Sequence, residues 1–257
     1  MKQFSQSRND FFDYVKNKPE NDIVVPENLE ETIQKAKRDL KLDTRNCYNF
    51  AFIGHTCSGK SSLINAIRGL KDDHPKAAKV GITETTHEIQ PYTFEDPQYS
   101  HVKIYDIPGA GTLTHNAESY YHDKCLCAFD CLIILTQDTL AQDEINFAIQ
   151  SLRYNQSIAF VRSKCDIVLY NALIKGEISQ IDQQAVKHYI SEMSDFYVEE
   201  IQRVDKPELC RVPCFFLSAY SLRNLIRGEK PAAVYHEKNF IDYMQAKSKW
   251  SRNIQQH

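Results

Sequence analysis

The sequence predicts an α/β fold in which helices cover both faces of a mostly parallel, six-stranded sheet. From residue 48 onward, β-prone apolar runs alternate with segments whose apolar residues recur at helical spacing. Four of these runs end in short motifs that carry phosphate- or base-binding residue types, and in an open α/β sheet such motifs meet at one rim, at the carboxyl ends of the strands. The chain has 257 residues, 42% of them hydrophobic, which suits one domain with a full core and an extension.

The predicted strands and helices alternate along the chain. The strands are expected at 48–54, 88–94, 102–106, 130–135, 157–162 and 213–217. The helices are expected at 60–69, 117–127, 141–153, 181–202 and 235–247. The residues expected to face the core are Ile145, Ala148, Ile149 and Leu152 in the third helix, and Ala185, Tyr189, Met193 and Phe196 in the fourth. This order predicts three layers with the sheet in the middle.

A helical extension is expected to precede the sheet. The predicted organisation is an N-terminal helical extension at 1–45, a main domain at 46–250 and a tail at 251–257. Within the extension, Pro26 opens an amphipathic helix whose apolar face carries Leu29, Ile33, Ala36 and Leu40. We expect this helix to pack on the main domain rather than to bind a partner or a membrane.

A phosphate-binding loop, Gly-x-x-x-x-Gly-Lys-Ser, lies between the first predicted strand and a helix, which is the context in which this motif indicates nucleotide binding. Glycines let backbone N–H groups surround an anion, and the start of the helix adds its positive dipole end. We expect Lys60 to reach the β- and γ-phosphates and the Ser61 hydroxyl to bind Mg²⁺. The predicted nucleotide contacts are Gly54, His55, Thr56, Cys57, Ser58, Gly59, Lys60, Ser61 and Ser62.

A second motif, Asp-Ile-Pro-Gly, begins at the end of the strand predicted at 102–106. Asp106 stands where a Mg²⁺ site needs an acidic side chain, and the N–H of Gly109 can sense a γ-phosphate. Between the two motifs, Thr85 and Thr86 are the candidates for a switch residue that adds a hydroxyl to Mg²⁺ and an N–H to the γ-phosphate.

Two further strand ends carry residues suited to a guanine base. After the strand at 157–162, Asp166 follows Ser163 and Lys164; its carboxylate can accept from guanine N1–H and the 2-amino group, a donor pair that adenine lacks. After the strand at 213–217 come Ser218 and Ala219, where a backbone N–H can bind guanine O6. Four motifs in this order predict a guanine-nucleotide site.

The sequence resembles the immunity-related GTPases, a family of the dynamin-like class. The resemblance is carried by Gly-Ile-Thr-Glu-Thr-Thr at 81–86, Asp-Ile-Pro-Gly-Ala-Gly-Thr at 106–112 and Phe-Val-Arg-Ser-Lys-Cys-Asp at 160–166, with shorter matches at 91–92, 120, 129–134 and 216–218. It covers about residues 48–220. The resemblance implies a three-layer P-loop GTPase domain, with Mg²⁺ as cofactor and GTP and GDP as substrate and product.

The resemblance also implies roles for residues in the switch and for a second protomer. Thr86 matches the switch threonine, and Glu84 matches a glutamate that contacts the nucleotide ribose of a facing protomer. A homodimer through the nucleotide face is therefore expected, acting in cell-autonomous immunity or in vacuole- or membrane-associated processes, with a family member or a membrane-associated protein as a further partner.

The chain departs from the family pattern at both ends. Family members usually continue into a large C-terminal helical domain, whereas this chain stops near its last predicted core helix, close to Trp250. Many members carry a lipidated N-terminal glycine, whereas Lys2 follows Met1 here. Three interpretations stay open: a minimal form, a piece of a longer protein, or a relative with a different output. Membrane remodelling is not expected of residues 1–257 alone, because much of the family's assembly and membrane-binding surface lies in the C-terminal helical domain.

Catalysis is expected to be slow in the monomer. Ala110 occupies the position after Gly109 where many small GTPases place a water-orienting glutamine, and its methyl group cannot polarise water. The predicted catalytic residues are Lys60, Thr86, Glu84 and Gly109, with a further group supplied in trans; His55, His87 and His115 are candidates for assistance or are ordinary loop histidines. The alternative function is a non-hydrolysing GTP/GDP-binding module that regulates longer relatives.

Composition narrows the remaining function classes. The net charge of −3 gives no reason to expect nucleic acid as a partner. Without a membrane-length apolar run or a signal-peptide pattern, a cytoplasmic location is expected, with peripheral attachment to an intracellular membrane left open. The eight cysteines are expected to be free thiols. A zinc site at His122, Cys125, Cys127 and Cys131 is disfavoured, because a Cys-x-x-Cys pair is missing.

Overall fold

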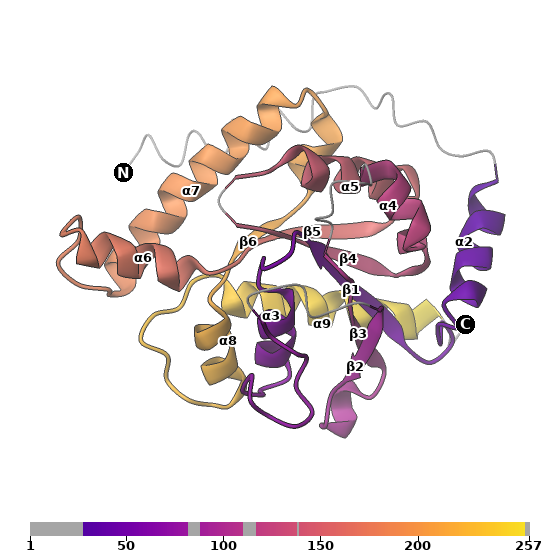
Figure 1. The fold of residues 1–257 in the computed structure, drawn as a ribbon, viewed down its shortest axis with the longest axis horizontal. Coiled ribbons are helices and arrows are strands. Elements are labelled where there is room, and N and C mark those ends of the chain that lie inside the picture. Colours follow the sequence, from indigo (N-terminus) through magenta and orange to yellow (C-terminus); the bar gives the residue numbers. More distant parts are fainter. Residues whose placement is uncertain (1–27, 82–87, 110–116, 138, 255–257) are drawn as a thin grey trace.

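The computed structural model describes residues 28–81, 88–109, 117–137 and 139–254, and within them it contains a mixed sheet of six strands. The strands run in the order β2-β3-β1-β4-β5-β6 (Figure 1). Their bounds are β1 Tyr48–Gly54, β2 Gln90–Thr93, β3 Val102–Asp106, β4 Cys131–Thr136, β5 Ser157–Arg162 and β6 Cys214–Phe216. All neighbouring strands are parallel except β2 and β3. The predicted strands are confirmed, with β1, β3 and β5 at the predicted residues.

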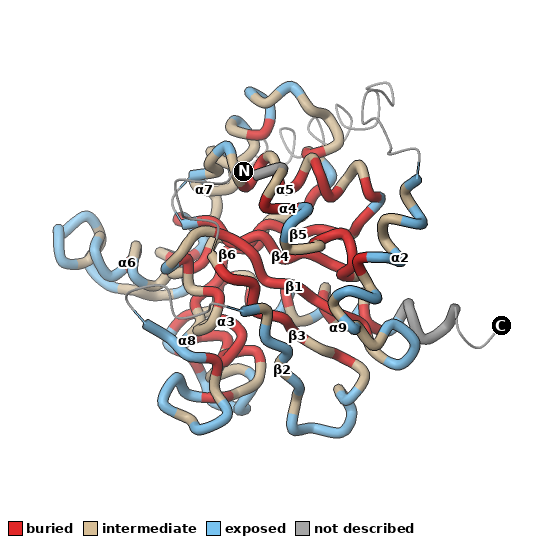
Figure 2. Tube along the Cα trace, turned by 45° about the vertical axis from the view of Figure 1, so that its right-hand side comes forward, coloured by how far each residue is buried: buried red, intermediate tan, exposed pale blue. Residues whose placement is uncertain are grey.

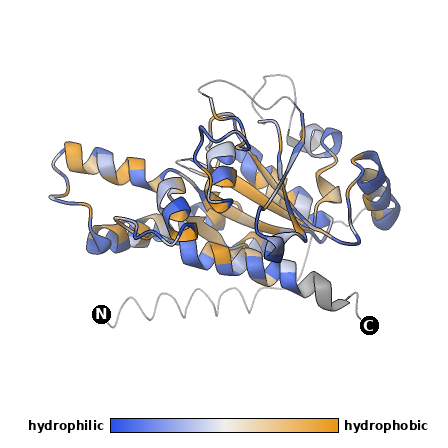
Figure 3. Ribbon diagram, turned by 90° about the horizontal axis from the view of Figure 1, so that it is seen from below, coloured by the Kyte–Doolittle hydropathy of each residue, from blue (hydrophilic) through white to orange (hydrophobic). Residues whose placement is uncertain are grey.

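The sheet has one core on each face, because alternate residues of a strand point to opposite sides. In β1, Phe50 and Phe52 pack on the side covered by α3 (Lys60–Ile67), α8 (Ala219–Ile226) and α9 (Glu237–Ile254). Ala51 and Ile53 pack on the side covered by α2 (Leu29–Asp39), α4 (Ala117–Asp123) and α5 (Gln142–Arg153). The buried strands in Figure 2 and the hydrophobic sheet between more polar helices in Figure 3 display the same three-layer arrangement. The predicted α/β fold is confirmed.

The predicted amphipathic helix packs on the sheet domain as α2. Ala36 is buried, and Leu29, Ile33 and Leu40 contact the same core as α4 and α5. The helix carries Glu30 and Glu31 in its first turn and Lys37 and Arg38 in its last turn, an order that complements the helix dipole. These acidic and basic residues therefore stabilise the two ends of α2.

The five helices predicted to alternate with the strands occur as α3, α4, α5, α7 and α9, but with different bounds; the largest difference is at the end of α9, predicted at 247 and found at Ile254. The helix expected at 117–127 ends at Asp123, because Cys125 adopts a left-handed conformation (φ 51°) that an α-helix cannot contain; a 3₁₀ turn, η2 (Leu126–Ala128), follows. The helix expected at 181–202 is α7 (Gln183–Arg203), which begins after the capping side chain of Asp182. Further 3₁₀ turns are η1 (Pro97–Tyr99) and η3 (Pro207–Arg211).

Two helices beside the strand ends were not predicted from the sequence: α6 (Cys165–Ile174) and α8. Both are short, and α6 has apolar residues all around, so it leaves no amphipathic period to read. One side of α6 is buried through Cys165 and Leu169, whereas Ile167, Tyr170 and Ile174 are exposed. Together with α7, α6 lies beyond the β6 edge of the sheet (Figure 1). Within the described part of the chain, no helix is long and apolar enough to cross a membrane.

Candidate functional site

The four predicted motifs meet at one rim of the sheet. β1, β3, β5 and β6 are parallel members of the sheet, and each motif begins at the carboxyl end of its strand. Gly54 at the end of β1 pairs with Leu135 of β4, which places the phosphate-binding loop near the middle of this rim. The structure therefore brings together the phosphate and base residues of the predicted site that fall within its described part.

Two glycines allow the phosphate-binding loop to turn. Gly54 has φ 141°, and a Cβ there would lie 2.5 Å from the carbonyl oxygen of Leu135. Gly59 has φ 92° and is the N-cap of α3. Since other L-residues rarely adopt these backbone angles, both positions of the motif require glycine for a conformational reason. The loop therefore ends against the N-terminus of α3, which favours an anion.

Lys60 lies within the curve of this loop and is only 7% exposed. Its Nζ donates to the carbonyl oxygens of Gly54 at 3.0 Å and His55 at 2.9 Å. A buried ammonium is stable only when it is well hydrogen-bonded or paired with an anion. The two carbonyl contacts hold the charge at the place where the loop amides would surround a phosphate.

Ser61 and Asp106 meet beside Lys60. The Ser61 hydroxyl donates to Oδ2 of Asp106 at 2.7 Å, and Asp106 is fully buried at the end of β3. A hydroxyl and a carboxylate are the hard oxygen donors that Mg²⁺ prefers, so the residues present fit the predicted metal. The third predicted ligand, Thr86, lies outside the described residues, as do Thr85 and Glu84.

Gly109 lies directly against the phosphate-binding loop. A Cβ at Gly109 would lie 2.5 Å from Oγ1 and 2.8 Å from the backbone nitrogen of Thr56. The hydroxyl of Tyr120 on α4 donates to the carbonyl of Pro108 and anchors the turn from the other side. Only glycine permits this approach between the two motifs. Ala110 and Thr112, which continue the motif, lie outside the described residues.

The outer side of the phosphate-binding loop is fastened to the predicted base residues. Ser163 Oγ donates to the carbonyl of Ser58 at 2.6 Å, and Lys164 Nζ donates to the carbonyl of Cys57 at 2.6 Å. Gln137, which follows β4, donates to the same Cys57 carbonyl at 2.7 Å. Cys57 itself is exposed and has φ 62°. Gln137 was not predicted as a site residue, because polar residues commonly follow strands in loops and its position therefore gives no specific signal.

His55 connects the phosphate-binding loop to α5. Its Nε2 lies 3.4 Å from Oε1 of Glu144 and 3.9 Å from Oδ2 of Asp143, both in the first turn of α5. Glu144 is 3% exposed; burial raises the pKa of its carboxyl, and the charge of His55 opposes that rise. His55 is therefore an anchored loop residue rather than an isolated one. The other two histidine candidates, His87 and His115, lie outside the described residues.

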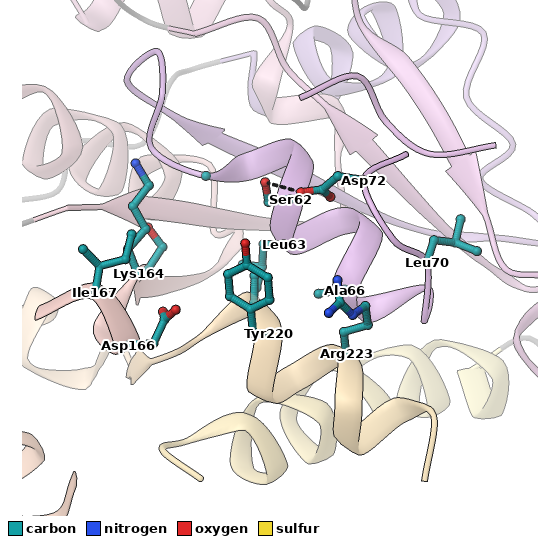
Figure 4. Close-up of a pocket in the computed structure, with 13 residues that line it drawn as sticks. Ser62, Leu63, Ala66, Leu70, Asp72, Lys164, Asp166, Ile167, Tyr220 and Arg223 are labelled. Atoms are coloured by element: carbon teal, nitrogen blue, oxygen red, sulfur yellow. Dashed lines mark hydrogen bonds between the residues drawn. The ribbon is translucent and has the colours of Figure 1, made fainter. Parts of the chain in front are cut away.

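A cleft of about 160 Å³ continues from the phosphate-binding loop between α3, α6 and α8 (Figure 4). Asp166 lies in the first turn of α6 and lines the cleft together with Lys164. Across from them, α8 contributes Ala219, Tyr220 and Arg223. The remaining lining residues are Gly59, Ser62, Leu63, Ala66, Leu70, Asp72, Ser163 and Ile167. The cleft thus has a carboxylate on one side, an aromatic ring on the other and the phosphate-binding loop at its end.

The wall formed by α8 was not predicted. Tyr220 is 62% exposed, and the guanidinium carbon of Arg223 lies 5.3 Å from the centre of its ring, which is a cation–π contact. On the opposite wall, Ser62 donates to Asp72 at 3.3 Å (Figure 4). An exposed aromatic ring at the mouth of a cleft offers a flat apolar face to a planar ligand.

Ser218 is held by a residue that sequence analysis missed. Its N–H donates to Oε1 of Glu237 at 2.9 Å, and its hydroxyl accepts from the N–H of Ser221. The N–H of Ser218 is therefore occupied. Ala219 begins α8, and the first amides of a helix have no acceptor within the helix. Of the two residues predicted to supply an N–H for a base oxygen, Ala219 is the better placed.

The cysteines behave as free thiols and small apolar residues. None of the eight, all of them among the described residues, forms a disulfide, and Cys127 and Cys131 are buried. Burial raises the pKa of Cys127 to about 11 and that of Cys131 to about 12, so both stay protonated. Within the described part of the chain, no group of three or more histidine, cysteine and acidic residues is placed so that it could hold a metal ion.

Comparisons with known proteins agree with this arrangement of motifs. The family model described as interferon-inducible GTPase (IIGP) matches residues 18–228. Interferon-inducible GTPase 5 of Bos taurus is 35% identical over 139 residues, which are 54% of this chain and 29% of that protein. Interferon-inducible GTPase 1 of Mus musculus is 27% identical over 191 residues, which are 74% of this chain and 44% of that protein. The chain thus spans less than half the length of these relatives.

Among solved structures, the chain is similar to Aquifex aeolicus Era bound to GDP and AlF₄⁻, in an alignment that covers 75% of this chain and 60% of the Era chain. The identity is 15% and the TM-score is 0.46.

Proposed function

The chain belongs to the interferon-inducible GTPase family, and we propose that it binds guanine nucleotides at this rim and hydrolyses GTP to GDP. One observation carries the proposal: the cleft beside Asp166 opens onto the same loop whose Lys60 is buried next to Ser61 and Asp106. Because the cleft and the loop adjoin, one ligand can place its base beside Asp166 and its phosphates on the loop. Family membership further supports a role in cell-autonomous immunity.

At the phosphate end, the chain supplies charge and oriented N–H groups. Lys60 would exchange part of its contact with the loop carbonyls for phosphate oxygens, while the N-terminus of α3 faces the same anion. Ser61, Asp106 and Thr86 would hold Mg²⁺, which neutralises charge on the phosphates when bound. Gly109 would offer its N–H to the γ-phosphate, and its close contact with Thr56 supports this position.

At the base end, Asp166 would accept from N1–H and the 2-amino group of guanine, and the N–H of Ala219 would donate to O6. Both residues line the cleft. Adenine carries an amino group instead of O6 and lacks the N1–H donor, so it would leave the carboxylate of Asp166 and the N–H of Ala219 unsatisfied. The ring of Tyr220 would cover part of the base.

Turnover is proposed to depend on a second protomer. Ala110 follows Gly109 and has no group that orients water. Family resemblance supports nucleotide-dependent dimerisation through the rim, with Glu84 contacting the ribose bound by the facing protomer. His55 is not proposed to orient water, since its ring nitrogen is directed to Glu144 on α5.

The test is GTP turnover per molecule over a wide range of protein concentration. Turnover should rise with concentration and vanish in Lys60→Ala, whereas Lys35→Ala, which removes an exposed lysine of α2, should behave as wild type. Flat, near-zero turnover with tight GDP binding would overturn the hydrolytic mechanism and leave a non-hydrolysing binding module. Base recognition is tested separately, since Asp166→Asn should lose affinity for GDP and gain affinity for xanthosine diphosphate, whose oxygen at C2 needs a donor.

A further inference from the structure

Glu237, the first residue of α9, is a fully buried carboxylate that has no part in the mechanism above. Its Oε1 accepts from the N–H of Ser218 at 2.9 Å, and its Oε2 accepts from the N–H of Tyr235 at 2.6 Å. Burying a charge is costly unless strong hydrogen bonds compensate it. The side chain therefore connects the start of α9 to the turn after β6, 19 residues earlier in the chain.

Two backbone donors converge on this side chain, and only a carboxylate answers both. An ionised glutamate presents two acceptor oxygens, whereas the amide nitrogen of glutamine only donates, and the hydroxyl of a protonated glutamate is a weaker acceptor that must itself donate. With glutamine, one N–H would face another donor in a buried place. The two backbone donors therefore favour the ionised form of Glu237, in opposition to the effect of its burial.

The turn that Glu237 holds is also tied to the helix that carries Asp166. The N–H of Cys165 donates to the carbonyl of Leu217 at 3.1 Å. Cys165 precedes Asp166 directly, and Leu217 precedes Ser218 directly. The backbone bond therefore joins α6 to the turn before α8, and Glu237 fixes that turn to the start of α9.

We propose that Glu237 is a positioning residue for guanine recognition: by holding the N–H of Ser218, it orients the N–H of Ala219 toward the base oxygen opposite Asp166. This proposal rests on the guanine site proposed above. It adds that recognition of O6 depends on a buried acid outside all four sequence motifs.

The proposal makes O6 recognition sensitive to pH. Burial, with a smaller contribution from the charge of Asp166 on α6, raises the pKa of Glu237 to about 7, although the backbone N–H donors lower it. The other titratable groups around it are the thiol of Cys165, the phenol of Tyr235 and the neighbouring His236, whose pKa is lowered by burial. As the pH falls below 7, Glu237 gains a proton, one of its oxygens becomes a hydroxyl and thus a weaker acceptor, and its hold on the turn weakens.

The experiment compares dissociation constants for GDP and 6-thio-GDP, in which sulfur, a weak acceptor, replaces O6. The ratio of the two constants isolates the O6 contact, because both ligands carry the same phosphates and the same donors toward Asp166. In Glu237→Gln, the GDP constant should rise about tenfold while the 6-thio-GDP constant changes little. Glu177→Gln, a surface change on the same residue type, should retain the wild-type ratio.

A second measurement does not depend on the folding of the variant. In the wild-type protein, the preference for GDP over 6-thio-GDP should shrink as the pH falls from 7.5 to 5.5, and in Glu237→Gln it should be small and independent of pH. A wild-type ratio that is constant with pH, or an equal loss of affinity for both ligands in Glu237→Gln, would overturn the proposal.

Failure of this proposal is distinguishable from failure of the proposed function. A wild-type protein that binds ADP as tightly as GDP would refute the guanine site itself. If the protein prefers GDP to ADP and Asp166→Asn shifts the preference to xanthosine diphosphate, but Glu237→Gln retains the wild-type ratio, only the role of Glu237 is refuted.

Discussion

The proposed phosphate end and the proposed base end of the cleft are built in different ways. The phosphate end is one contiguous loop, from Gly54 into the first turn of α3, joined by the Asp106–Gly109 turn at the next strand. The base end is assembled from the first turn of α6, the turn before α8 and the first residue of α9. A short local motif makes the first, whereas three distant segments must pack together to make the second.

This difference follows from what each part of a nucleotide presents. Phosphates are symmetric, charged groups, so backbone amides and one ammonium suffice to bind them. A base is planar, with donors and acceptors in fixed places, so its recognition needs side chains and N–H groups oriented from several directions. Changes at the phosphate end should therefore weaken every nucleotide alike, and changes at the base end should alter the order of preference.

The strongest test of this comparison is Lys60→Ala. The substitution removes a buried ammonium with two carbonyl contacts, and charged hydrogen bonds are each worth about 1.5–3 kcal/mol. We expect affinity for GDP and for xanthosine diphosphate to fall together, by about 100-fold, in equilibrium titrations. A loss confined to GDP would contradict the division between the two ends.

Gly109→Ala should affect turnover more than binding. The added Cβ would come within 2.8 Å of the backbone of Thr56, so the turn must move away from the place proposed for the γ-phosphate. We expect GTP turnover to fall about tenfold, while GDP affinity, which involves no γ-phosphate, stays within about threefold. Single-turnover kinetics measure the first effect and GDP titration the second. The control for the loss of a glycine is Gly176→Ala, at a surface glycine that has open space around it and a φ of 74° that adds local strain.

The acid at the base end should be visible in the pH dependence of stability. The pKa of Glu237 in the folded protein, about 7, lies above its ordinary value of 4.5, so this group's contribution to stability is complete below pH 4.5 and is lost as the pH rises through 7. The free energy of unfolding of Glu237→Gln, measured relative to that of wild type, should therefore rise by on the order of 3 kcal/mol when the pH is raised from 5 to 8. Denaturant titrations without nucleotide measure it; a difference independent of pH would show that Glu237 is ionised throughout.

The smallest expected effect is that of Tyr220→Ala. Stacking of a base on an aromatic ring is worth about 1–3 kcal/mol, and the exposure of Tyr220 favours the lower limit. We expect about fivefold weaker binding of GDP, inosine diphosphate and xanthosine diphosphate alike, since stacking does not read base edges. Tyr170→Ala removes an equally exposed ring of α6 outside the cleft, and it should bind all three ligands as wild type does.

Sequence reasoning succeeded where structure is local. The strand predicted at 48–54, in a sheet with helices on both faces, is confirmed as β1, and its Phe50 and Phe52 pack in one core while Ala51 and Ile53 pack in the other. The context of the phosphate-binding loop, a strand before it and a helix after it, is confirmed as well. Such features depend on residues that are neighbours in the chain, so they can be predicted from a single sequence.

Sequence reasoning failed at helices α6 and α8 and at two buried acids. The helix that carries Asp166 was not predicted, because α6 is short and apolar on all sides. Glu144 and Glu237 resemble the ordinary surface glutamates of a helix start, where acidic residues are common. Only the packing of α5 on the phosphate-binding loop, and of α9 on the β6 turn, shows that both side chains are buried.

The sequence by itself determined the six strands, five of the helices that alternate with them and the phosphate-binding loop, and it supplied the prediction that Asp166 reads the base. These depend on short-range patterns: side-chain alternation, glycine at positive φ and a carboxylate after a strand. The tertiary structure alone decided that α8 forms the opposite wall of the cleft, that His55 is anchored by Glu144 and that Glu237 holds Ser218. The physical reason is that a buried charge takes its partners from whichever segments the fold brings to it, and spacing along the chain does not encode that choice.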